Sequence, residues 1–170
     1  MKFTYLEQPP NKWTFEPPKV KRWVESRCKG KVLNLFAGKT RLMVKEFRVD
    51  VSKEFNPDFC GDAFEFVKTT DLKFDTIILD PPYNLRKSRE KYQGRYIGSF
   101  TKIKKELVRI LNPGGRVITF GYNSNGMGRG FEKTEICLIN CKGDHQDIIV
   151  TVEDKTSDLR QNTIKKKVDG

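Results

Sequence analysis

Residues 74–83 read Phe-Asp-Thr-Ile-Ile-Leu-Asp-Pro-Pro-Tyr. The first six form the most continuous strand-like apolar run of the chain, which is typical of a parallel strand buried on both faces. Asp80 ends the run, and the two prolines that follow have no N–H to offer a neighbouring strand. We therefore expect a central strand over 74–79 that delivers Asp80 to the edge of a sheet.

Shorter strand-like and helix-like segments alternate on both sides of this stretch. Strands are expected over 31–36, 47–51, 58–60 and 116–122, and helices over 19–28, 63–69 and, with Ser99 as N-cap, 100–111. Such alternation predicts an α/β domain with a mostly parallel sheet covered on both faces. Residues 132–140 and 147–153 read as a hairpin that adds one antiparallel edge strand.

Four of the expected strands end at or close to a glycine or aspartate: Gly38, Asp50, Asp62 and Asp80. Ligands of open parallel sheets bind at the carboxyl ends of the strands. These four positions therefore predict a site for a polar cofactor along one edge.

The chain divides into three parts by composition. Residues 1–30 form a polar arm with two Pro-Pro pairs and then a helix, residues 31–155 hold the sheet domain, and residues 156–170 form a loose basic tail. A length of 170 residues suits one such domain.

Charge points to a polyanionic partner. Lys and Arg outnumber Asp and Glu by 33 to 22, which gives a net charge of +11. A surface of this sign attracts RNA or DNA. A Lys-rich proteome is the plainer explanation, but it would enrich both signs of charge. Without a membrane-length apolar run or a signal peptide, we expect no membrane contact and a cytoplasmic location.

The cysteines predict no metal site. Cys137, Cys141 and His145 are spaced by four, but structural zinc normally takes four ligands in paired spacing, and no CxxC pair occurs. Reduced thiols of a cytoplasmic protein are the simpler reading.

Asp80, Pro81, Pro82 and Tyr83 carry the most specific chemistry. An amino group on a nucleic-acid base is a poor nucleophile because its lone pair is delocalised into the ring. The Asp80 carboxylate and the Pro81 carbonyl can accept both amino hydrogens and so localise that pair. Pro82 stiffens the turn, and Tyr83 offers a face on which a base stacks. The plainer alternative is a strand-ending turn with a packed tyrosine.

The motif resembles that of the Rossmann-type S-adenosylmethionine-dependent amino-methyltransferases, which modify adenine, cytosine or guanine through Asp/Asn-Pro-Pro-Tyr. The resemblance extends from about residue 32 to residue 153. Its specific segments are 32–38 (Val-Leu-Asn-Leu-Phe-Ala-Gly) and 80–84. It implies a single Rossmann-like (class I methyltransferase) domain, S-adenosylmethionine as cofactor, and direct methyl transfer without a metal.

The resemblance also implies which residues contact the cofactor. Phe36, Ala37 and Gly38 would pass close to its methionine part, and Asn34 belongs to the same segment. Asp50 would bind the ribose hydroxyls, a use that fits the general logic of ribose recognition. Asp62, with Ala63, would hold the adenine amino group. The alternative for Asp50 and Asp62 is a solvated loop acid.

Two features depart from the family pattern. Lys39-Thr40-Arg41 stands where the family continues with a second small residue and glycine, and the interval from Gly38 to Asp50 is short. The helix that normally fills this interval must be truncated or replaced by a loop. Lys39 and Arg41 then either reach the cofactor carboxylate or a substrate phosphate, or are plain surface cations.

Cations interleaved with aromatic residues follow the motif, a pattern typical of a flap over nucleic acid. A solvated charged loop is the alternative. Two aromatic residues of the N-terminal arm are a second predicted cover for the cofactor or the base. The predicted substrate-binding residues are Asn84, Arg86, Lys87, Arg89, Lys91, Tyr92, Tyr96, Trp13 and Phe15.

Together these features favour a nucleic-acid amino-methyltransferase acting on adenine N6, cytosine N4 or guanine N2. RNA (rRNA or tRNA) is favoured over DNA, because no separate recognition region is evident and structured RNA can be selected by shape. A DNA adenine or cytosine amino-methyltransferase remains open. So does a non-catalytic nucleic-acid-binding subunit of a methyltransferase complex, working with a protein partner or as a homodimer. Asp80 and the basic charge argue against methylation of a protein glutamine.

Overall fold

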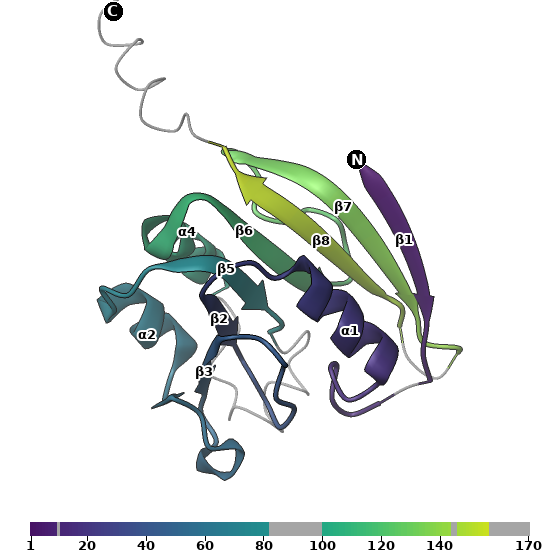
Figure 1. Cartoon of the computed structure of the whole chain (residues 1–170), viewed down its shortest axis with the longest axis horizontal. Coiled ribbons are helices and arrows are strands. Elements are labelled where there is room, and N and C mark those ends of the chain that lie inside the picture. The colour runs from purple at the N-terminus through teal and green to yellow at the C-terminus, as the bar shows by residue number, and fades with distance from the viewer. Residues whose placement is uncertain (10, 82–99, 144–145, 157–170) are drawn as a thin grey trace, which may run out of the picture.

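The computed structural model describes residues 1–9, 11–81, 100–143 and 146–156, which build one eight-stranded sheet with helices on both faces (Figure 1). The strands are β1 (Lys2–Glu7), β2 (Val32–Leu35), β3 (Glu46–Asp50), β4 (Phe59–Cys60), β5 (Phe74–Leu79), β6 (Leu111–Gly121), β7 (Phe131–Asn140) and β8 (Ile148–Lys155). The helices are α1 (Pro18–Arg27), α2 (Ala63–Thr69) and α4 (Phe100–Ile110), with a 3-10 turn η1 (Lys53–Phe55).

The strand order is β1-β7-β8-β6-β5-β2-β3-β4, and the described pairs that do not involve β8 are parallel. The chain proceeds outward from β2 on one side and from β5 on the other, so the order reverses between these two neighbours. Leu35 is in register with Leu79, and both strands therefore end at the same edge. The predicted α/β fold with a mostly parallel sheet and an antiparallel C-terminal strand is confirmed.

The predicted position of the antiparallel strand is wrong, because β8 is internal. It pairs antiparallel with β6 on one side and with β7 on the other. The outer side of β7 is covered by β1, from Lys2 opposite Glu135 to Glu7 opposite Asn140. Residues 1–30 thus contribute an edge strand and a helix to the same sheet, a pairing that joins segments more than a hundred residues apart in sequence.

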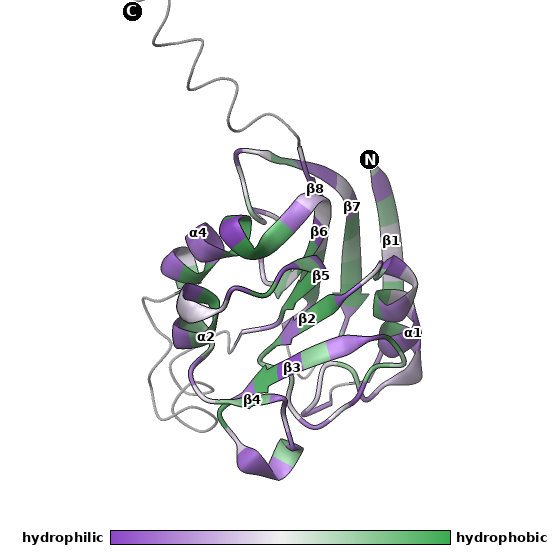
Figure 2. Ribbon diagram, turned by 60° about the vertical axis from the view of Figure 1, so that its left-hand side comes forward, coloured by the Kyte–Doolittle hydropathy of each residue, from purple (hydrophilic) through white to green (hydrophobic). Residues whose placement is uncertain are grey.

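Two apolar clusters lie on opposite faces of the sheet (Figure 1). One is covered by α2 and α4 and the other by α1, whose Val20, Trp23 and Val24 are buried at helical spacing. The central strand β5 is buried from Thr76 to Leu79, as its apolar run predicts. Figure 2 shows the same hydrophobic character along the central strands.

Residues 36–45 connect β2 to β3 without a helix, as the short interval predicts. Parallel neighbours are usually joined through a crossover helix. Here Leu42 of the connection packs in the same cluster as α1, so α1 covers the face that a crossover helix would cover.

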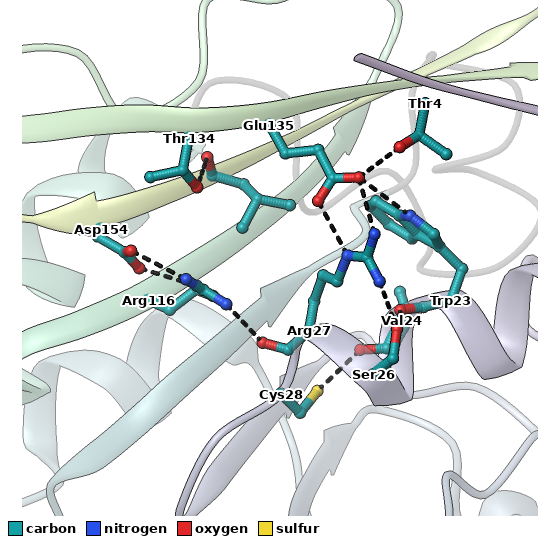
Figure 3. A network of polar contacts seen from close by, with 11 residues as sticks. Thr4, Trp23, Val24, Ser26, Arg27, Cys28, Arg116, Thr134, Glu135 and Asp154 are labelled. Atoms are coloured by element: carbon teal, nitrogen blue, oxygen red, sulfur yellow. Dashed lines mark hydrogen bonds and ion pairs between the residues drawn. The ribbon is translucent and has the colours of Figure 1, made fainter. Parts of the chain in front are cut away.

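A buried carboxylate ties the N-terminal elements to the sheet (Figure 3). Glu135 on β7 accepts hydrogen bonds from Arg27 Nε and Nη2, both at 2.9 Å, from Thr4 Oγ1 at 2.5 Å and from Trp23 Nε1 at 3.3 Å. Burial alone raises the pKa of Glu135, but the hydrogen bonds from Arg27 and Thr4 outweigh it and hold the pKa at about 2.

We predict that Glu135 makes the fold acid-sensitive. Its pKa in the folded protein, about 2, lies below the ordinary 4.5, so its contribution is fully present above pH 4.5 and is lost as the pH falls towards 2. The shift corresponds to about 3 kcal/mol of unfolding free energy. Denaturant titrations from pH 7 to pH 2 should therefore show that Glu135→Gln is less stable than the wild type at pH 7 and loses less stability on acidification.

The control is Glu132→Gln, an exposed carboxylate on the same strand. Its unfolding curve should follow the wild type across the range. The same pH dependence in Glu135→Gln and the wild type would contradict the prediction.

Candidate cofactor and active site

The candidate site lies where β2 and β5 end side by side. Phe36 follows β2, and Asp80 and Pro81, both half-buried, follow β5. The first two residues of the predicted catalytic motif are therefore at the strand-order reversal, the usual ligand position in an open α/β sheet. The remaining motif and flap residues lie outside the described ranges: Pro82, Tyr83, Asn84, Arg86, Lys87, Arg89, Lys91, Tyr92 and Tyr96.

The turn after β2 has an unusual backbone. Phe36 has a φ of 61° and Gly38 a φ of 60°, both in the left-handed region. A bulky residue rarely adopts this conformation, at a cost of roughly 1–2 kcal/mol. The Phe36 ring is only 5% exposed and packs in the core, and the Ala37 amide donates to Val49 O at 3.0 Å. Core packing and β3 thus hold the turn in this strained form.

Asp50, at the end of β3, binds the same turn. Its carboxylate is 3% exposed and accepts hydrogen bonds from the amides of Gly38 and Ser52, each at 2.9 Å. A carboxylate has about four acceptor positions, so these two bonds leave further acceptor capacity. Asp50 orders the Gly38 turn whether or not it also contacts a ligand.

Asp62 is the N-cap of α2. Its Oδ1 accepts the amide of Glu65 at 3.0 Å, and the adjacent Ala63 is buried. Capping uses one of the two carboxylate oxygens. Asp62 therefore has a structural role that does not depend on a ligand, while it stands at the same edge as Asp50.

Asn34 is completely buried within β2. Its Nδ2 donates to Glu46 Oε2 at 2.9 Å. The side chain is thus bonded to β3, two residues before the Phe36–Gly38 turn begins.

Trp13 and Phe15 have different environments. The Trp13 ring lies against Gly38, where an added Cβ would be 3.2 Å from it, and meets the Phe55 ring edge-on at 5.1 Å. Phe15 is 3% exposed and packs edge-on against Phe120 in the core, at 5.2 Å. The structure brings Trp13 to the candidate site and leaves little of the Phe15 ring for a ligand.

Glu46 and Arg48, two charged residues of β3, were not predicted from the sequence to belong to the site. Arg48 is completely buried, and its guanidinium donates to Gly38 O and to Phe55 O, while Glu46 pairs with it from the same strand. The signal was present in Glu46-Phe47-Arg48-Val49-Asp50, since period-2 alternation puts its three charged residues on one strand face.

The described residues carry neither a cluster of metal ligands nor a membrane-spanning helix. In the described ranges, no group of three or more His, Cys, Asp or Glu side chains is placed to hold a metal ion. Cys137 and Cys141 are buried, and desolvation raises the pKa of Cys137 to about 12. None of the described helices is both long enough and apolar enough to span a bilayer.

No protein-family model matches the chain, and no curated protein sequence matches it. Solved structures match in fold. A putative SAM-dependent methyltransferase from Streptococcus mutans is 19% identical, with a TM-score of 0.57 over 80% of this chain and 48% of that one. N-methyltransferase NodS from Bradyrhizobium japonicum WM9 is 13% identical, with a TM-score of 0.57 over 84% of this chain and 99% of that one.

A third match is the Pyrococcus abyssi tRNA (uracil-54, C5)-methyltransferase in complex with S-adenosyl-L-homocysteine. It is 16% identical, with a TM-score of 0.54 over 80% of this chain and 37% of that one. At such identities the likeness establishes the fold alone: a mostly parallel α/β sheet domain like those of these methyltransferases. The chain spans about half the length of the Streptococcus mutans protein.

We predict that Gly38→Ala displaces Trp13. The substitution combines a left-handed φ with a Cβ 3.2 Å from the indole ring. Gly114→Ala is the matched control, because its φ is 67° and an added Cβ meets nothing within 4 Å. Both should lose roughly 1–2 kcal/mol to backbone strain, and Gly38→Ala should lose about 1 kcal/mol more through overpacking.

Chemical denaturation and intrinsic fluorescence check this, since Trp13 and Trp23 are the two tryptophans of the chain. Emission should change in Gly38→Ala alone. Equal stability losses with unchanged emission would show that the ring does not rest on Gly38.

Proposed function

We propose that this chain is an S-adenosylmethionine-dependent methyltransferase that acts on an exocyclic amino group of a nucleic-acid base: adenine N6, cytosine N4 or guanine N2. The observation that carries the proposal is the position of Asp80 and Pro81 at the end of β5, beside the Phe36–Gly38 turn at the end of β2. The methyltransferase fold supports it, as do neighbours of the same fold that include a tRNA methyltransferase in complex with S-adenosyl-L-homocysteine.

The residues at this edge fit S-adenosylmethionine. The left-handed Gly38 keeps the turn without a side chain, and the buried Asp50 carboxylate keeps acceptor capacity after binding two amides. The Phe36–Gly38 turn would hold the methionine part, Asp50 the ribose, and Asp62 with Ala63 the adenine amino group. When bound, the cofactor supplies the methyl group as an electrophile on sulfur. Trp13, lying on Gly38, would form an outer wall of this site.

Asp80 and Pro81 would prepare the nucleophile. The carboxylate and the main-chain carbonyl each accept one amino hydrogen, so the nitrogen lone pair is withdrawn from the ring and aimed at the methyl group. Alignment and electrostatic preorganisation supply the rate enhancement. Pro82 would stiffen this turn and Tyr83 would stack on the base. A base inside a duplex has to leave the stack to reach them.

RNA, in particular rRNA or tRNA, is the favoured polymer. The net charge of +11 suits a phosphate backbone. Lys39 is exposed directly after Gly38, while Arg41 donates to Asn56 O and so helps to hold the neighbouring loop. A structured RNA can be selected by its shape through contacts to its phosphates and 2′-hydroxyls, which suits a basic surface.

We predict that Asp80→Ala lowers methyl transfer at least about a hundredfold, because a preorganised acceptor at the reacting amine is lost. S-adenosylmethionine affinity should stay near the wild-type value. Tritiated-methyl transfer to total RNA, genomic DNA and protein, followed by nucleoside mass spectrometry, measures turnover and product. Calorimetric titration measures cofactor binding.

The control is Asp71→Ala, an exposed carboxylate before β5. It should behave as the wild type. Near-wild-type turnover of Asp80→Ala would refute the catalytic assignment, and methylated deoxynucleosides alone would refute RNA. A wild-type protein that binds RNA but not S-adenosylmethionine would instead be a non-catalytic binding module.

We further predict that Lys39 contacts a phosphate. Lys39→Glu should weaken RNA binding and reduce the slope of log K against log salt by about one, as the loss of one phosphate contact requires. Lys45→Glu is the control. This exposed lysine directly precedes β3 and so lies at the amino end of the strand, away from the carboxyl ends where the candidate site is. Fluorescence anisotropy with a labelled RNA over a salt series tests both, and equal slopes for the two variants would contradict the assignment.

A further inference from the structure

The face of β3 beneath residues 36–45 is charged. Glu46, Arg48 and Asp50 alternate along the strand and share this face, with side-chain exposure of 6% for Glu46 and 0% for Arg48. Burying ions is unfavourable unless each is paired and hydrogen-bonded. A strand that needed only to pack under α1 would carry apolar residues here.

The two terminal nitrogens of the Arg48 guanidinium donate to main-chain carbonyls in two different loops. One terminal nitrogen, Nη2, donates to Gly38 O in the turn after β2, and Nη1 donates to Phe55 O in η1 at 2.7 Å. Its Nε lies 3.4 Å from Glu46 Oε1. The planar fork of the guanidinium thus joins the segments that follow β2 and β3, a geometry that a lysine ammonium cannot reproduce.

The Gly38 residue is therefore held from both sides. Asp50 accepts its N–H at 2.9 Å, and Arg48 donates to its carbonyl. Both side chains come from the same strand, and Trp13 packs on the same glycine and on Phe55. With no crossover helix in residues 36–45, these contacts set the shape of the turn.

Glu46 extends the arrangement along the connection. Its Oε1 accepts the Leu42 amide at 3.0 Å, and its Oε2 accepts Asn34 Nδ2 at 2.9 Å. The carboxylate that balances Arg48 thus also fixes the returning half of the loop. The pair thus supports the connection at Gly38 and at Leu42.

We propose that Arg48 is a positioning residue for cofactor binding: its buried guanidinium holds the Gly38 and Phe55 carbonyls so that the Gly38 turn keeps the form that receives S-adenosylmethionine. This inference rests on the proposed function, because that function assigns the cofactor to the Gly38 turn. Arg48 acts through the turn and needs no contact with the cofactor or the base.

The test compares S-adenosylmethionine titrations of the full chain as wild type, Arg48→Met, Arg48→Lys and Arg116→Met. Arg116 on β6 is the matched control. Its guanidinium forms a two-bond ion pair with Asp154 and donates to Arg27 O, towards the amino ends of the parallel strands and away from the candidate site. Arg48→Met should raise the Kd for the cofactor at least about tenfold, the order expected when a hydrogen bond from a charged donor is lost. Arg48→Lys should fall between it and the wild type.

Two further readouts separate positioning from general destabilisation. Arg116→Met should lower the melting temperature without changing the cofactor Kd. In the Arg48 variants the KM for S-adenosylmethionine should rise while kcat at saturating cofactor stays within about threefold of the wild type, because only a step before chemistry is affected.

Wild-type cofactor affinity in folded Arg48→Lys and Arg48→Met overturns the inference while leaving the proposed function intact, and so does an equal loss of affinity in Arg116→Met. If Arg48→Met does not fold, Arg48→Lys decides alone. A wild-type protein that fails to bind S-adenosylmethionine overturns the proposed function, and this inference with it.

Discussion

The parallel, in-register pairing of β2 with β5 is the constraint on which the rest of the structure depends. Leu35 lies opposite Leu79, so the two strands leave the sheet at the same level and in the same direction. The strand order reverses between them, so the segments that follow diverge and leave room at the edge. Because both strands are buried on both faces, α1 must cover one side, and α2 with α4 the other. The position of Asp80 beside the Gly38 turn follows from the backbone pairing alone.

The connection from β2 to β3 is unusual for an α/β sheet, because charged side chains order it in place of a crossover helix. A crossover helix orders its loop through backbone hydrogen bonds and apolar packing. In residues 36–45 the loop is ordered by carboxylates and a guanidinium that bind main-chain groups: Asp50 and Arg48 at Gly38, and Glu46 at Leu42. Arg48 also binds the Phe55 carbonyl in η1. A buried ion pair contributes little net stability compared with apolar residues of the same volume. Its use here is better explained by the shape it imposes on the turn than by the free energy of unfolding.

The parts of the fold that follow from local pattern were predictable from the sequence. The strand over 74–79 and the helix over 63–69 match to the residue, because a continuous apolar run that stops at Asp80 and a helix-like spacing of apolar residues are short-range signals. Long-range contacts were not predictable. The β1–β7 pairing and the insertion of β8 between β6 and β7 depend on which distant strand offers an open edge. The same limit applies to the site. The sequence places Asp50 and Gly38 at the carboxyl ends of neighbouring strands, but only the contacts reveal that Asp50 and Arg48 both bind Gly38 and that Phe15 belongs to the core.

The N-terminal segment links the edge strand β1 to the candidate site. Trp13, which covers the Gly38 turn, is therefore held in place by the fold itself. β1 is fixed to β7 by its ladder and by the Thr4–Glu135 bond, and the Gln8 amide donates to Asn140 O just beyond. Further along, the Trp13 amide donates to Asn11 Oδ1, and Phe15 is buried against Phe120. Trp13 thus lies between two anchored points. Ordering a free arm over a ligand costs roughly 1–2 kcal/mol of backbone entropy per residue. Here that cost is met during folding, so Trp13 is already ordered against the Gly38 turn.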